Sequence, residues 1–170
     1  MKRIVIVLLL VFLSGCSGPA WETVTDPLET QTLPVWQDQI YEIQLGIPEN
    51  VTLLEKTPTM ALYSSKDGEL EIETSTFLCS GVEQAVKRIS GFPADRLTIL
   101  KTQRFDLPEY QFAWVSETEQ GTRLYRADLV LDGTCCYAVV CSSLELAGDY
   151  AAFQARQVFG SFGLLQNQGI

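Results

Sequence analysis

The sequence of 170 residues contains no histidine. Ser-His-Asp and Cys-His catalytic sets use an imidazole as the general base, and many zinc sites use one as a ligand, so these sets are excluded. Basic residues are also few, with 12 Lys and Arg against 21 Asp and Glu and a formal net charge of −9. Because nucleic-acid binding needs a basic surface, we expect no nucleic-acid partner.

Motifs for common cofactors are absent as well. The sequence has no calcium-loop pattern, no phosphate-binding glycine loop, no nucleophile elbow and no Cys-x-x-Cys pair. We therefore expect no metal, no cofactor and no enzymatic activity. Composition does not point to disorder, because 46% of the residues are hydrophobic and only 19% are charged.

The apolar run at the N-terminus is too short to cross a membrane as a helix. Lys2 and Arg3 precede ten apolar residues, 4–13, whereas a spanning helix needs about 20. A positive start followed by a short apolar run is typical of a signal peptide, which we assign to residues 1–15.

The segment Leu13-Ser14-Gly15-Cys16 resembles a bacterial lipobox, in which the cysteine thiol carries a diacylglycerol group. This resemblance implies lipid attachment at Cys16, with the membrane as a partner and the chain on its extracytoplasmic side. An ordinary secretory signal with an incidental cysteine is the alternative. Removal of residues 1–15 leaves ten basic against 21 acidic residues, a charge of −11, so acyl chains rather than charge must provide the anchoring.

The remaining chain divides into three parts. Residues 16–38 carry several prolines and threonines without apolar periodicity, which predicts a lipidated cysteine followed by a flexible tether. Residues 39–165 predict a single α+β domain, and residues 166–170 a short tail.

Apolar and polar residues alternate over most of this domain, as they do in half-buried strands. We expect strands over residues 41–47, 51–54, 60–64, 69–74, 97–105, 110–116, 123–131 and 134–143, and helices over 80–91 and 149–162. The dipeptide Asp132-Gly133 predicts a type I′ hairpin turn that places Leu131 opposite Thr134. The expected architecture is an antiparallel sheet of six to seven strands with two helices packed on one face.

This order of elements resembles the PsbP-like fold, which the photosystem II extrinsic subunit shares with nuclear-import factors that bind Ran and with many small bacterial lipoproteins. The similarity rests on the opening Tyr41-Glu42-Ile43-Gln44-Leu45-Gly46-Ile47-Pro48, the central hairpin, and the closing Phe159-Gly160-Ser161-Phe162. The resemblance implies a non-enzymatic accessory or binding domain, and it carries over no catalytic or ligand-binding residue.

Four cysteines follow Cys16, namely Cys79, Cys135, Cys136 and Cys141. An exported compartment permits disulfides. Neighbours on a strand point to opposite faces, so Cys135 and Cys136 should not pair with each other, whereas Cys79 and Cys141 are placed on one open face and are candidates for a disulfide. Free thiols are the alternative, and a redox-active or metal-binding set has no supporting spacing.

Two rows of side chains each allow two interpretations. Glu69, Glu71 and Glu73 share a strand face, where they serve either as carboxylates for hydrolysis or as a solubilising surface. Tyr110, Phe112 and Trp114 also share a strand face, either in the core or as a recognition surface.

These patterns lead to a membrane-anchored extracytoplasmic lipoprotein that acts as a non-catalytic binding or assembly module for an unknown protein or small molecule. One alternative is a lipoprotein that binds solutes or cell-wall fragments, which needs an apolar concavity. Another is a hydrolytic enzyme that uses surface carboxylates, which needs a deep pocket with converging acids.

Overall fold

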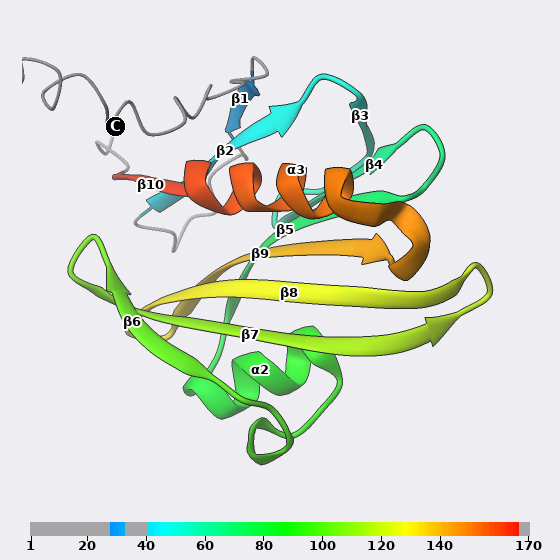
Figure 1. Cartoon of the computed structure of the whole chain (residues 1–170). Helices are drawn as coiled ribbons and strands as arrows, with labels where there is room; N and C mark the ends of the chain where they lie inside the picture. Colours follow the sequence, from blue (N-terminus) through cyan, green and yellow to red (C-terminus); the bar gives the residue numbers. More distant parts are fainter. Residues whose placement is uncertain (1–27, 33–40, 167–170) are drawn as a thin grey trace, which may run out of the picture.

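The computed structural model describes residues 28–32 and 41–166, which form two antiparallel sheets, two α-helices and two 3-10 turns (Figure 1). The larger sheet has seven strands, in the spatial order β3 (Val51–Lys56), β4 (Met60–Ser65), β5 (Leu70–Leu78), β9 (Cys135–Leu144), β8 (Gly121–Asp132), β7 (Leu107–Thr118) and β6 (Leu100–Arg104). The smaller sheet has the order β1 (Leu28–Thr32), β2 (Tyr41–Pro48) and β10 (Gly163–Gln166). The helices are α2 (Val82–Ser90) and α3 (Gly148–Ser161), and the 3-10 turns are η1 (Ala94–Arg96) and η2 (Glu145–Ala147).

The seven-stranded sheet carries a separate apolar core on each face. One core joins β2 and α3 to side chains such as Ile72 and Val139, and the other joins α2 to side chains such as Ala138. Figure 1 shows α3 on one side of this sheet and α2 on the other. The α+β class and the seven antiparallel strands are confirmed, but the placement of both helices on one face was wrong.

The reason lies in the central strand β9, which is apolar on both sides. Along β9, Cys135, Tyr137 and Val139 belong to the core beneath α3, whereas Cys136 and Ala138 belong to the core beneath α2. A strand buried on both faces has a continuous apolar run instead of an alternating one, so such a strand needs cover on both sides.

The hairpin between β8 and β9 exists as predicted, but its register differs. Asp132 lies opposite Cys135 and Leu131 opposite Cys136, so the two loop residues are Gly133 and Thr134. Only Gly133 has a positive φ, 58°, whereas a type I′ turn needs positive φ at both central positions. A single glycine at the first central position fits a type II′ turn. With Gly133 in that position, Leu131 lies opposite Cys136, two residues beyond the predicted partner Thr134.

The smaller sheet was not predicted. Its strand β1 pairs antiparallel with β2 and lies inside the segment 16–38. The prediction of a flexible tether therefore fails for Leu28–Thr32, and the rest of that tether lies outside the described residues. On the other edge of β2, β10 pairs with Tyr41–Gln44 directly after α3, so β2 and α3 are held together at one end.

No described helix is long and apolar enough to cross a membrane. Residues 1–15 and Cys16, on which the lipid-anchor prediction rests, lie outside the described residues.

Candidate functional site

A half-open cleft of about 410 Å³ lies between α3 and the strands β7, β8 and β9. It forms because α3 packs on β2 and β9 and leaves the neighbouring parts of β7 and β8 uncovered. The helix presents Ala152 and Ala155 to the cleft, and these short side chains leave the space that larger residues would fill.

The opposite wall of the cleft is apolar. Val115 on β7 lies directly opposite Leu124 on β8, with Ala113 two residues before Val115 on the same face. Val115 is 53% exposed and Leu124 44% exposed, so both side chains offer apolar surface to the cleft. This strip of exposed apolar surface beneath a helix has the composition of a ligand pocket.

Two arginines supply the charge of the cleft. The guanidinium of Arg126 lies 5.0 Å from the centroid of the Phe159 ring of α3, and Arg156 projects from α3 itself. Within the described part of the chain, neither forms an ion pair, whereas Arg104 and Arg123 do. The cleft is therefore locally positive in a chain with an excess of acidic residues.

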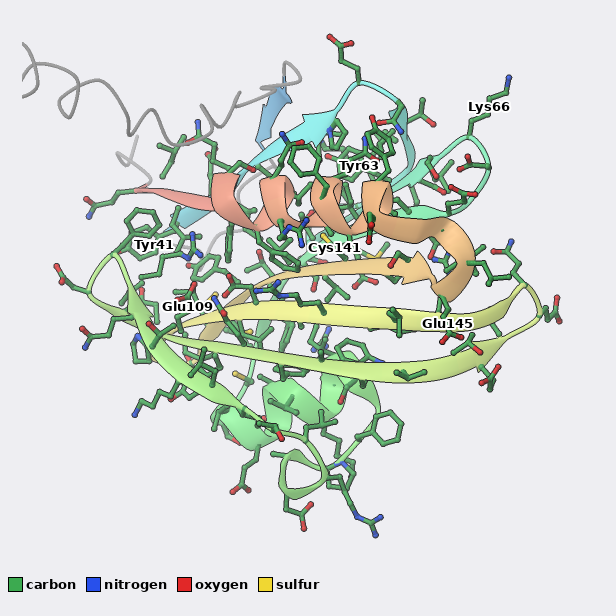
Figure 2. The ribbon with its side chains drawn as sticks, in the orientation of Figure 1. Tyr41, Tyr63, Lys66, Glu109, Cys141 and Glu145 are labelled. Atoms are coloured by element: carbon green, nitrogen blue, oxygen red, sulfur yellow. The ribbon has the colours of Figure 1, made fainter. Side chains whose placement is uncertain are left out.

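Cys141 forms part of the floor of the cleft, and Figure 2 shows it beneath α3. Burial raises the pKa of its thiol above the ordinary range, although the nearby Arg126 opposes this shift. The thiol is therefore protonated at neutral pH and contributes apolar surface, because nucleophilic attack requires the thiolate.

The predicted disulfide between Cys79 and Cys141 is wrong. Ile72 lies opposite Cys141, so Cys141 belongs to the core beneath α3. Cys79 belongs to the core beneath α2, together with Cys136. The seven-stranded sheet separates Cys79 from Cys141, and no disulfide joins the four cysteines at positions 79, 135, 136 and 141.

The aromatic row at positions 110, 112 and 114 faces α2, on the opposite side of the sheet from Val115. Phe112 is buried in the core, and Trp114 stacks between Phe112 at 5.6 Å and Tyr125 at 5.0 Å, measured between ring centroids. Tyr110 and Trp114 are half-buried at the border of this core. The structure thus makes Phe112 a core residue and brings the row together with Tyr125.

The three glutamates of β5 do not converge as a catalytic pair. Glu71 forms an ion pair with the buried guanidinium of Arg123, which also donates a hydrogen bond of 2.8 Å to Ser142 Oγ. Glu73 is half-buried, and burial raises the pKa of its carboxyl group. Glu69 is exposed. Only part of this row is therefore the solvated surface that alternation predicts.

A different pair of acids, which the sequence did not reveal, converges on the α3 side of the sheet. Arg104 Nε lies 2.5 Å from Glu109 Oε1, and Arg104 Nη2 lies 3.2 Å from Asp128 Oδ2. Burial, with a further contribution from Glu109, raises the pKa of Asp128 to about 7. Arg104 Nη1 also donates a 2.7 Å hydrogen bond to the Phe162 carbonyl, so this cluster ties β6, β7 and β8 to the end of α3.

This acidic pair is separate from the apolar cleft, whose lining includes neither Glu109 nor Asp128. Within residues 28–32 and 41–166, no group of three or more His, Cys, Asp or Glu side chains is arranged to hold a metal ion. The cleft is therefore suited to binding through apolar contact and positive charge.

Comparison with known proteins shows the fold but not a family. No family model and no curated protein matches the sequence. A structure from Bacteroides thetaiotaomicron aligns with a TM-score of 0.52 at 11% identity over 75% of this chain, which spans 46% of that protein's length.

Two further structures align over most of their own length. Cyanobacterial PsbP (CyanoP) from Synechocystis aligns with a TM-score of 0.56 at 12% identity, over 89% of this chain and all of CyanoP. LpqN of Mycobacterium tuberculosis, described as involved in cell envelope biogenesis, aligns with a TM-score of 0.50 at 12% identity, over 80% of this chain and 91% of LpqN. The seven-stranded antiparallel sheet with its two helices and its smaller sheet is therefore a PsbP-like α+β fold.

Proposed function

We propose that this protein is a membrane-anchored extracytoplasmic lipoprotein that acts as a non-catalytic binding module, with the cleft beneath α3 as its ligand site. The observation that carries the binding role is the cleft itself, which is apolar, half-open and about 410 Å³ in volume. Ligand pockets for small molecules have volumes between about 300 and 1,000 Å³. The volume of this cleft therefore suits a small-molecule ligand better than a protein partner. The solute-binding form of the hypothesis therefore has more support than the assembly form.

The proposal of a non-catalytic role has two supports. The sequence lacks histidine, and the converging acids Glu109 and Asp128 are both bound to Arg104. Carboxylates held in this way stabilise the sheet and are not directed into the cleft.

The anchor rests on the segment Leu13-Ser14-Gly15-Cys16 and on the shortness of the apolar run before it. A neighbour with a role in cell envelope biogenesis is consistent with this location. Cys16→Ala should move the protein from the lipidated to the unlipidated form and abolish incorporation of radiolabelled palmitate. The matched control is Ser17→Ala, which leaves the thiol in place and should keep the label. Incorporation of the label into the Cys16→Ala chain would contradict the anchor.

The binding role is tested by blocking the cleft. Ala155→Trp places an indole where the cleft now lies, so the thermal stabilisation that a bound small molecule gives should disappear. Lys87→Trp, at an exposed position of α2 on the other side of the sheet, is the matched control and should retain it. A small-molecule panel in which both variants respond alike would argue against the cleft as the ligand site.

A further inference from the structure

Resting on this proposed function, we propose that the ligand of the cleft is an anionic amphiphile. Its acyl chain would lie along the apolar strip formed by Val115, Leu124 and the alanines of α3, and its carboxylate or phosphate group would lie between Arg126 and Arg156.

Apolar side chains line the cleft on both the sheet and the helix. Val115 and Leu124 belong to neighbouring strands that run beneath α3, and Ala152 and Ala155 lie about one helical turn apart along the facing side of the helix. A linear acyl chain can contact both of these apolar surfaces at once. A cleft that is partly open to solvent also allows such a chain to enter and leave from the side.

The charge of the cleft selects the head group. The guanidinium of Arg126 on β8 contacts the ring of Phe159, and Arg156 of α3 also lines the cleft. A guanidinium has a planar set of donors that matches the oxygens of a carboxylate or phosphate. Two such groups near each other disfavour a cationic head group because like charges repel.

Asp128 interacts electrostatically with Arg126, but no acidic residue in the described part of the chain forms an ion pair with either arginine. The nearest acidic side chain on β8 is Asp128, two residues from Arg126, and its carboxylate accepts hydrogen bonds from Arg104 at 3.2 Å and from Gln111 at 3.4 Å. Arg126 and Arg156 form no ion pair with any carboxylate of the described residues. They are therefore available to an anion from solution.

The test compares four amphiphiles with the same twelve-carbon chain. Dodecanoate, dodecyl phosphate, dodecyl maltoside and dodecyltrimethylammonium are titrated below their critical micelle concentrations into the chain from residue 16 onward. Cys16→Ser keeps that chain unlipidated, so no detergent competes, and isothermal titration calorimetry measures each affinity. We expect the two anionic probes to bind at least tenfold more tightly than the maltoside, and the cationic probe to bind most weakly.

Three variants measure how much each arginine contributes to the binding of the anionic head group. Arg126→Gln and Arg156→Gln should each weaken dodecanoate binding about tenfold, since a hydrogen bond to a charged group contributes that much, and should leave maltoside binding unchanged. Arg96→Gln removes an exposed arginine outside the cleft and is the matched control. A tighter affinity for dodecyl phosphate than for dodecanoate would indicate a phosphorylated lipid, and the reverse order a fatty acid; both support the proposal.

The outcomes that overturn the proposal are distinct from those that overturn the proposed function. Equal binding of all four head groups, lost in Ala155→Trp, would leave the cleft as the ligand site and exclude the anionic head group. Binding of dodecanoate that Ala155→Trp does not reduce, or no binding of any probe, would contradict both the anionic ligand and the ligand-binding role of the cleft.

Discussion

The two faces of the seven-stranded sheet are each covered by one helix, but the side chains between helix and sheet differ in size. Beneath α2, the large rings of Phe77 and Phe112 fill the space around Ala85 and Val86 of the helix. Beneath the outer part of α3, the apolar residues that the helix contributes are only alanines, and the strands contribute aliphatic residues that remain exposed. The first arrangement makes a closed core, and the second leaves a cleft.

This difference assigns separate tasks to the two faces. The α2 face stabilises the fold through close packing, whereas part of the α3 face gives up packing for space that a ligand can occupy. A substitution on the α2 face should therefore change the free energy of unfolding, and one in the cleft should change ligand affinity.

The largest expected effect is on stability at the α2 face. Phe112→Ala should lower the free energy of unfolding by about 3–5 kcal/mol, because it removes a buried ring and leaves a cavity. Val115→Ala, three residues further along β7, should lower it by less than about 1 kcal/mol because its side chain is 53% exposed. Chemical denaturation of both variants measures the difference, and similar losses would contradict the division between the faces.

The next effect concerns the acidic pair on the α3 side. Because the folded-state pKa of Asp128 is raised to about 7, the folded chain holds this proton more tightly than the unfolded chain. The stabilisation is complete below about pH 4 and is lost as the pH rises through 7, a change on the order of 2 kcal/mol. Asp128→Asn cannot titrate, so the difference in stability between wild type and variant should change with pH in this window.

Denaturation at pH 4.5 and 7.5 measures that difference. Asp132→Asn, at the end of the same strand, provides the matched control and should follow the pH dependence of the wild type. A difference between wild type and Asp128→Asn that is the same at both pH values would show that the carboxyl group of Asp128 titrates normally.

A smaller effect is expected when the cleft is filled. Ala155→Leu adds apolar contact between α3 and the sheet, so it should raise the free energy of unfolding by about 0.5–1 kcal/mol while it weakens dodecanoate binding. Opposite signs for stability and affinity are expected where a protein leaves space for a ligand. Loss of stability together with loss of affinity would indicate that α3 is already closely packed at this position.

The last expected outcome concerns the cysteines, which the sheet divides between its faces, and it involves no change in stability. Cys79 lies on the α2 side and Cys141 on the α3 side, so peptide mapping without reductant should contain no peptide pair linked through these two residues. A Cys79–Cys141 peptide would contradict the separation of the two cores. Cys141→Ser provides the negative control for that assignment.

Much of this fold follows from the sequence because its strands have clear patterns. Alternation along Tyr41–Pro48 predicted β2, and the dipeptide Asp132-Gly133 predicted the hairpin between β8 and β9. The sequence did not reveal which face of the sheet each helix covers. Residues 135–141 are apolar on both sides of the strand, so their periodicity does not distinguish a buried face from an exposed one. The pairing of Cys79 with Cys141 failed for the same reason.

The candidate site was harder to predict than the fold. The cleft depends on where α3 lies over the sheet, and no local pattern encodes that position. The alanines at positions 152 and 155 and the arginines at positions 126 and 156 are ordinary helix and strand residues until the fold brings them together. Likewise, Arg104, Glu109 and Asp128 meet only through the register of three strands.

The central claim is that the cleft beneath α3 binds the ligand and that the α2 face does not. Its most direct test is a two-dimensional NMR titration with dodecanoate of the chain from residue 16 onward, carrying Cys16→Ser. The account predicts the largest chemical-shift changes at Leu124, Ala152 and Ala155, with little change at Ala85 and Val86. Changes centred on α2, or spread equally over both faces, would contradict it.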